Sequence, residues 1–190
     1  MSETWAILSD IHGNIDALDA VLRDAEVQGA SRIIMLGDAI NYGAASVEVV
    51  ERICAVADVI LLGNHEQAAL LGESGMSGPA AAGLAWAVEQ LSGCEAWSAL
   101  VAEATFPEAS QRSYEGVQLV HASPRDPVFE YVWPGHSSYY LAFNDQIDSR
   151  LSNILSAQSA LHCFCGHTHV PALLLPYDER RILKQLPWDR

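Results

Sequence analysis

The sequence of this 190-residue chain predicts an α/β fold in which a parallel sheet is covered by helices on both faces. Two observations support this prediction. In the first third of the chain, three short apolar runs are each followed by a polar loop and then by a segment suited to a helix. The loops are short, as expected where parallel strands alternate with helices that connect them.

The first unit begins with the apolar run 5–8, and polarity changes abruptly at Ser9. Apolar residues at 15, 18, 21, 22 and 25 then follow the helical period, and Gly29 ends that helix. The other elements of the three units are expected at 32–36 (strand), about 46–56 (helix) and 57–62 (strand).

After residue 65 the pattern changes. Residues 72–79 are rich in Gly and Ser, and helix-like stretches follow at 80–91 and 97–104. We expect residues from about 72 to 110 to form a small helical cap, inserted into a single domain that spans residues 1–190. Four later elements are expected: a β-hairpin from 111 turning at Glu115–Gly116, a helix over 141–157, a buried strand over 161–165, and one further strand after Pro171. The tail from residue 178 shows no clear element.

Composition limits the function classes. A net charge of −14 argues against binding nucleic acid along the surface, because such affinity comes largely from Lys and Arg. No apolar run approaches the ~20 residues of a membrane span, and the N-terminus lacks the pattern of a secretory signal. We therefore expect a cytoplasmic protein. The four cysteines lack zinc-site spacing, and Cys163 and Cys165 are expected to pack in the core, with a role as metal ligands as the alternative.

Polar side chains that can bind metal follow five of the expected strands. They are Asp10 and His12, Asp38, Asn64 and His65, His121, and His167 with His169. His167 and His169 are two residues apart, so a strand ending at Gly166 would place both imidazoles on one face. Ligands of open α/β sheets bind at the carboxyl ends of the strands, where these residues are expected to meet. The alternative for Asp10 or Asn64 is a helix cap.

The ligand types indicate the class of metal. A mixture of carboxylate, imidazole and amide oxygen suits divalent Mn, Fe, Zn or Ni. With His65 set aside, seven candidate ligands exceed one tetrahedral site, whereas two ions that share a bridging carboxylate would use all seven. Such a pair activates a bridging water and holds a phosphoryl group between the ions. The sequence therefore predicts hydrolysis of a phosphate ester.

Five motifs resemble those of the calcineurin-like metallophosphoesterase superfamily, in the same order and in the same places after strands. They are SDIHGN (9–14), GDAINYG (37–43), GNHE (63–66), VHASP (120–124) and GHTH (166–169). The likeness spans residues 5–171, and the stretches HASPRDPVFEY and WAVEQLS are similar to the small bacterial predicted phosphodiesterases of that superfamily. The resemblance implies a four-layer α/β/β/α sandwich.

The resemblance also implies roles by matching position. Two divalent ions, with Mn preferred and Fe, Zn or Ni as alternatives, would share Asp38. The other ligands divide between the ions: Asp10, His12 and His169 for one, and Asn64, His121 and His167 for the other. His65 matches the residue that protonates the leaving oxygen or binds phosphate, and an imidazole titrates near enough to neutrality for that task.

The chain departs from the family in two places. The protein Ser/Thr phosphatase branch continues its second motif as Asp-Arg-Gly, whereas this chain has Asn41, Tyr42 and Gly43, which argues against a protein phosphatase. Asn41 is expected to hydrogen-bond His65 without stabilising its charged form as a carboxylate would. Relatives usually continue past the last motif into further strands, so we expect a short C-terminal part and a second sheet that is short or completed by a partner chain.

Three residues are candidates for binding substrate. Arg125 suits a phosphate, with an ion pair to Asp126 or Glu130 as the alternative. Tyr42 is placed to line the pocket unless it serves packing, and His136 lies in an expected loop over the site.

The predicted function is hydrolysis of a small phosphodiester or phosphomonoester through attack by a metal-bridging water or hydroxide, with His65 assisting the leaving group. The alternatives are a catalytically weak or inactive scaffold of the same fold and a nuclease, against which the acidic charge counts. The partner is a small phosphorylated substrate, with no membrane and no nucleic acid expected. The apolar segment 173–175 and the tail suit either a homodimer interface or the core.

Overall fold

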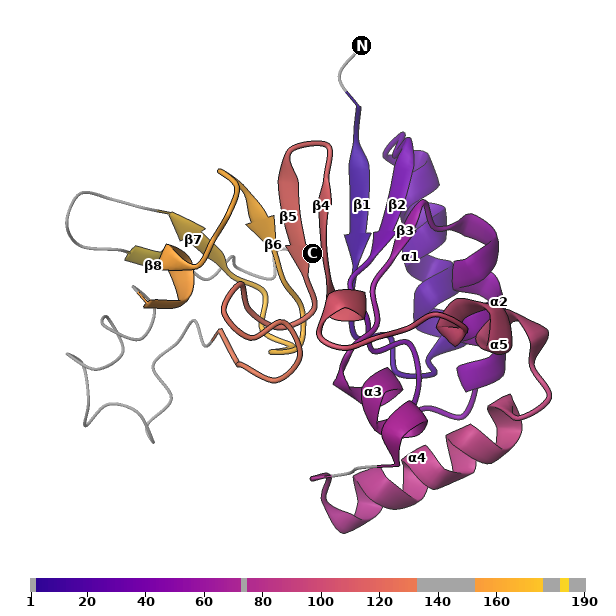
Figure 1. Cartoon of the computed structure of the whole chain (residues 1–190). Coiled ribbons are helices and arrows are strands. Elements are labelled where there is room, and N and C mark those ends of the chain that lie inside the picture. Colours follow the sequence, from indigo (N-terminus) through magenta and orange to yellow (C-terminus); the bar gives the residue numbers. More distant parts are fainter. Residues whose placement is uncertain (1–2, 73–74, 133–152, 176–181, 185–190) are drawn as a thin grey trace.

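The computed structural model describes residues 3–72, 75–132, 153–175 and 182–184 (Figure 1). Its first layer is a parallel sheet in the order β1 (Trp5–Leu8), β2 (Arg32–Met35) and β3 (Val59–Ile60), with Trp5 opposite Arg32 and Ile34 opposite Val59. All three strands were predicted, although β3 is two residues long.

Helices cover one face of this sheet, and Figure 1 shows the first two of them on the side away from β4–β6. The first two helices, α1 (Ile15–Val27) and α2 (Ser46–Val56), were predicted from the sequence. Asn14 caps α1, because its side chain accepts a hydrogen bond from the Ala17 N–H at 3.0 Å. The remaining helices are α3 (Asn64–Leu71), α4 (Gly78–Leu91), α5 (Glu95–Val101) and a 3₁₀ turn, η1 (Glu108–Ser110). None of the helices in the described part of the chain has the length and hydropathy of a membrane span.

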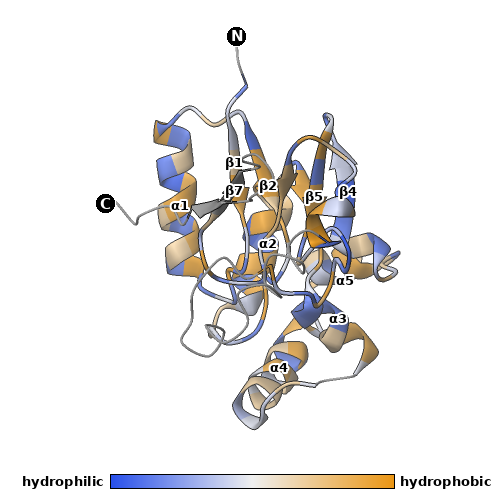
Figure 2. Cartoon of the chain, turned by 90° about the vertical axis from the view of Figure 1, so that its left-hand side faces the viewer, coloured by the Kyte–Doolittle hydropathy of each residue, from blue (hydrophilic) through white to orange (hydrophobic). Residues whose placement is uncertain are grey.

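The other face of the sheet packs against a second sheet. Its order is β4 (Gln111–Tyr114), β5 (Val117–Val120) and β6 (Cys163–Phe164), antiparallel between β4 and β5 and parallel between β5 and β6. The hairpin turns at Glu115–Gly116 as predicted, with both residues at positive φ. Figure 2 shows β2 and β5 as hydrophobic ribbons, whereas β4 is more hydrophilic. β7 (Leu173–Leu175) and β8 (Ile182–Lys184) form a separate antiparallel pair.

The expectation of helices on both faces is therefore wrong. Ile34 and Val59 belong to a core between the two sheets, while Met35 and Val49 belong to a core between the first sheet and the helices. Strand residues that are apolar on both sides show that each face is covered, but not whether a helix or a sheet covers it. The described residues thus form three layers. The predicted helix at 141–157 lies largely outside them, and the four-layer sandwich stays a prediction.

Two smaller expectations also change. The tail was expected to lack any element, but β8 lies in it. Cys165 is exposed and Cys163 is partly exposed, because β6 is at the edge of its sheet within the described residues.

The helices α4 and α5 of the expected cap pack on α2, and Leu84, Leu91 and Cys94 join the core of the helical layer. The division into one domain with a cap insertion stays a prediction.

Candidate metal centre

The loops after the strands deliver their polar side chains through unusual backbone conformations. Seven non-glycine residues of these loops have positive φ angles, between 49° and 73°: Asp10, His12, Asp38, Asn41, Tyr42, His167 and His169. Left-handed backbone costs about 1 kcal/mol or more at each such residue, and it concentrates at functional sites. His167 and His169 therefore reach the site from a turn, and not from one face of a strand as the spacing suggested.

Two glycines allow the closest approach of these loops. A Cβ added at Gly63 would lie 2.7 Å from Cε1 of His121, and one added at Gly37 would lie 2.9 Å from Nδ1 of the same ring. Both distances are shorter than real Cβ contacts. The fully buried imidazole of His121 therefore fits between the second and third strand ends only because these positions carry no side chain.

One group of donors is formed by Asp10, His12 and His169. Nε2 of His169 lies 3.1 Å from Oδ1 of Asp10 and 3.2 Å from Nε2 of His12. Nδ1 of His12 donates to the Ile40 carbonyl at 3.0 Å, which leaves its Nε2 lone pair toward the other two residues. The ligand atoms of the three lie within 4.8 Å of one another, the separation expected of side chains that share an ion.

A second group is formed by Asp38, His121 and His167, whose ligand atoms also lie within 4.8 Å of one another. His121 donates from Nδ1 to the Leu36 carbonyl at 2.9 Å, and its Nε2 lies 3.1 Å from Oδ1 of Asn64. His167 bonds the carbonyl of Phe129 through Nε2 at 3.2 Å, which leaves its Nδ1 available. Each imidazole is therefore anchored through one nitrogen and can bind metal through the other.

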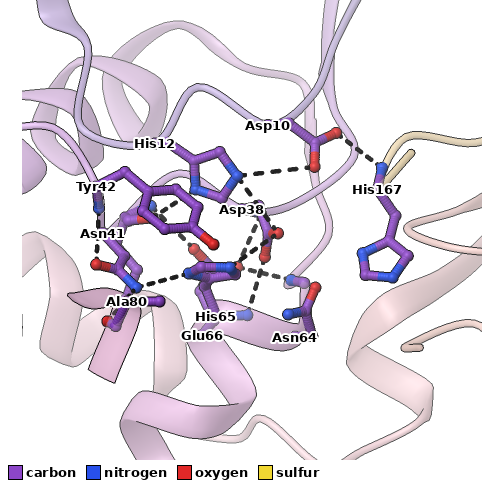
Figure 3. A network of polar contacts seen from close by, with 12 residues as sticks. Asp10, His12, Asp38, Asn41, Tyr42, Asn64, His65, Glu66, Ala80 and His167 are labelled. Atoms are coloured by element: carbon purple, nitrogen blue, oxygen red, sulfur yellow. Dashed lines mark hydrogen bonds and ion pairs between the residues drawn. The ribbon is translucent and has the colours of Figure 1, made fainter. Parts of the chain in front are cut away.

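Asp38 lies between the two groups (Figure 3). Its Oδ2 is 3.7 Å from Nε2 of His12, 3.5 Å from Nε2 of His121 and 3.9 Å from Nε2 of His65. Its Oδ1 accepts the His65 backbone N–H at 2.9 Å. The side chain is buried, and burial together with Glu66 and Asp10 raises its pKa well above the usual value.

This electrostatic environment fits divalent cations. Burial lowers the pKa of His121 to about 4 and also lowers the pKa values of His12 and His167, so these rings are neutral at pH 7 and cannot balance the charge of Asp38. A buried carboxylate surrounded by neutral imidazoles is unfavourable without a cation. Two ions placed at the two groups would supply that charge, and neutral imidazole is the form that binds metal.

His65 lies beside the donors and bonds Asn41, the candidate that the sequence analysis paired with it. Nδ2 of Asn41 lies 2.9 Å from Nδ1 of His65 and donates also to the Ala80 carbonyl at 3.1 Å, while its Oδ1 accepts the Tyr42 N–H at 2.7 Å. These contacts fix the amide orientation, so Nδ1 of His65 accepts and its hydrogen lies on Nε2. Burial, then His12 and His121, lower the pKa of His65 to about 3. The expectation that it titrates near neutrality is therefore wrong for the metal-free protein.

Glu66 is a buried carboxylate beside the site that the sequence analysis did not single out. It is buried and accepts four backbone N–H groups, those of Gly63 (2.7 Å), Asp38 (2.9 Å), Ala39 (2.8 Å) and Ile40 (3.3 Å). Burial raises its pKa, and these four bonds oppose the rise. Glu66 thus ties the Asp38 loop to the start of α3. The signal was available, since a Glu three residues after a helix cap commonly bonds back to the cap.

Replacing Glu66 by Gln should loosen that loop. A Gln side chain offers one acceptor oxygen and places an NH₂ group against the remaining N–H donors, so we expect the free energy of unfolding to fall by about 2–4 kcal/mol. Metal affinity should fall roughly 10- to 100-fold, as for other residues that orient ligands. Urea unfolding and metal titration measure both. Glu51→Gln, on the exposed face of α2, is the matched control, and equal behaviour of the two variants would contradict this role.

The three candidate substrate residues lie in different places. Tyr42 is at the site, with its ring centroid 4.7 Å from that of His12 and 4.9 Å from that of His65. Arg125 instead forms an ion pair with Glu130, one of the alternatives in the sequence analysis, and does not line the cavities described below. His136 lies outside the described residues.

Comparisons with known proteins identify what the chain is similar to. The family model for calcineurin-like phosphoesterase matches residues 4–171. An uncharacterized protein of Methanocaldococcus jannaschii, MJ0912, is 29% identical over 171 residues, which cover 87% of this chain and 62% of that protein. A crystal structure of a metallophosphoesterase from Sphaerobacter thermophilus has a TM-score of 0.69 and 29% identity, covering 90% of this chain and 63% of the other.

A second solved structure, the hypothetical protein PH1004 from Pyrococcus horikoshii, has a TM-score of 0.64. At 17% identity it shows likeness of fold alone, over 96% of this chain and 75% of the other. The chain spans slightly less than two thirds of the length of the M. jannaschii and S. thermophilus proteins.

Proposed function

The chain belongs to the calcineurin-like phosphoesterase family, and we propose from that membership and from its clustered donors that it hydrolyses a small phosphodiester with two divalent metal ions. The observation that carries the proposal is the position of Asp38. Its Oδ2 lies within 3.7 Å of an imidazole nitrogen from each of the two donor groups, so one carboxylate can serve ions on both sides.

We assign the donors to the two ions as the family resemblance implies. Asp10, His12 and His169 would hold one ion, and Asn64, His121 and His167 would hold the other, with Asp38 shared. When bound, two such ions supply a water-derived nucleophile at neutral pH and neutralise charge on the phosphoryl oxygens. The donor set is mixed carboxylate, imidazole and amide, which suits Mn, Fe, Zn or Ni, and of these we propose Mn.

The side chains around the ions have separate tasks. Asp10 accepts the His167 backbone N–H at 2.8 Å and so joins the first strand end to the last. Asn41 holds His65 in the tautomer with hydrogen on Nε2, the nitrogen that faces Asp38. Neutral His65 would donate a hydrogen bond from Nε2 to an oxygen of the reacting phosphate or of the leaving group. A neutral imidazole is a poor proton donor, so its contribution is stabilisation of charge more than proton transfer.

The test measures metal content and turnover on one preparation. We expect two ions per chain after incubation with Mn, and Mn-stimulated hydrolysis of bis(4-nitrophenyl) phosphate that a chelator abolishes. Folded protein of confirmed mass that binds two ions and hydrolyses neither this diester nor 4-nitrophenyl phosphate would instead favour the scaffold alternative. Protein that binds no divalent ion at all would reject the metal centre itself.

A further inference from the structure

A cavity of about 560 Å³ extends from the metal centre along α3 to the start of α4. Asn64, His65 and His167 line its inner end. Its other walls are largely apolar or aromatic and include Met76, Phe129 and Tyr131. A site that binds only phosphate needs no such extension, so the cavity indicates a substituent beyond the phosphorus atom.

Three aromatic residues line this cavity, and the rings of two of them contact histidines of the site. The ring centroid of Tyr131 lies 4.1 Å from that of His167, with an interplanar angle of 30°. Tyr42 meets His65 edge-on at 4.9 Å and 61°. Tyr42 and Phe129 are 61% and 56% exposed, so both side chains have a large accessible surface that a ligand can cover. Rings held in this way are suited to stack on another flat ring.

Among the described residues, the walls of this cavity carry no positively charged side chain. No Lys or Arg is among the residues described along it, and the nearby Arg125 is paired with Glu130 through both Nε and Nη2. A substituent bearing further phosphates or carboxylates would therefore find no cationic side chain among these residues. A neutral ring would instead gain from burial and from stacking.

A second cavity, of about 620 Å³, lies on the Asp10 and His12 side of the centre and shares Tyr42 with the first. Its lining is more polar and includes Asn14 and Asp16. The metal centre thus has room for one substituent on each side. That arrangement suits a phosphodiester, whereas a phosphomonoester would leave one cavity without a substituent.

We infer that the first cavity binds a flat aromatic group on the leaving alcohol of a phosphodiester. The inference rests on the proposed function, and it places the leaving group on the side of His65, which lines this cavity. In the reaction, an oxygen from water forms a bond to phosphorus and the bond from phosphorus to the aromatic alcohol's oxygen breaks. The electron pair leaves with that oxygen, which takes up the proton that the attacking water loses and is released as the alcohol, while the phosphomonoester product keeps the other substituent.

The test compares two diesters whose leaving alcohols have similar acidity, methyl phenyl phosphate and methyl hexafluoroisopropyl phosphate. Because the two alcohols have similar acidity, phenolate has no chemical advantage as a leaving group. A higher kcat/KM for the phenyl ester therefore reports binding of its ring. We expect the phenyl ester to have a kcat/KM about tenfold higher, the scale of one stacked ring. Phe129→Ala should reduce that preference to about twofold or less. Leu161→Ala, at a residue that is 86% exposed and lines neither cavity, should keep it.

Inhibition distinguishes two sources of such a ring. Phenol represents an aryl ester and thymidine a nucleoside ester, and each is tested as a competitive inhibitor of bis(4-nitrophenyl) phosphate hydrolysis in the wild type and in Phe129→Ala. Inhibition by either that weakens in the variant supports the inference. Equal kcat/KM for the two methyl esters, with hydrolysis of both, overturns the inference and leaves the proposed function intact. Hydrolysis of no diester under any metal overturns both.

Discussion

Asp38→Asn should abolish phosphodiester hydrolysis and at the same time stabilise the metal-free protein. The asparagine keeps the shape of the side chain and can still accept the His65 N–H, but it removes the negative charge that two cations would share. We expect kcat/KM to fall by about 10³-fold or more and the metal content to drop below two ions per chain.

The gain in stability has a separate cause. Burial and the neighbouring carboxylates Glu66 and Asp10 raise the pKa of Asp38, so its charged form is unfavourable in the folded protein without metal. Because the folded pKa lies above the unfolded value, the protein loses stability as pH rises through the interval between them. Removing the charge should raise the free energy of unfolding by roughly 1–3 kcal/mol near pH 7, in the presence of a chelator.

Metal analysis measures the metal content, steady-state kinetics measure kcat/KM, and urea unfolding in the presence of a chelator measures the free energy of unfolding. Asp24→Asn, on the exposed side of α1, is the matched control and should change none of them. Retention of two ions with normal turnover would show that Asp38 does not bridge. Lower stability without metal would show that its charge is compensated within the protein itself.

Much of this centre could be predicted because it depends on one rule of topology. Parallel strands end at a common edge, so Asp10, Asp38 and Asn64 had to lie near one another once three strands were recognised. His121 and His167 follow strands of the second sheet, and their motifs placed them correctly beside the first. The bond from Asn41 to His65 was also expected, and the structure confirms it.

The features that sequence could not give depend on packing between distant segments. Both faces of β2 are apolar, and nothing in its sequence distinguishes a covering helix from the sheet that contains Leu119. The pairing of Arg125 with Glu130 depends on how one loop folds back on itself. The lowered pKa of His65 depends on burial and on neighbours that only the fold brings together, so reference values for free histidine misled the prediction.

His65→Ala should reduce kcat by about 10²-fold, the effect of removing one well-placed donor to a developing negative charge. The ring nitrogen Nε2 lies 3.9 Å from Oδ2 of Asp38, close enough to reach a phosphate oxygen at the centre. KM should change less than kcat, because the bond strengthens as charge develops. His162→Ala, at an exposed residue, is the control for loss of an imidazole as such. Full activity in His65→Ala would remove this residue from the mechanism.

The pH dependence decides how His65 acts. With its pKa lowered to about 3, His65 is neutral throughout the range from pH 5 to 8. The kcat of the wild type should therefore not fall at high pH through deprotonation of His65, so its basic side should have no limb that the His65→Ala variant lacks. Asn41→Asp places a carboxylate against Nδ1, which would then donate to it and favour the imidazolium. This variant should therefore raise the pKa of His65 and add a basic limb, absent from Asn41→Asp combined with His65→Ala. If the wild type already shows that limb, His65 works as a charged proton donor, and Asn41 does not hold it neutral.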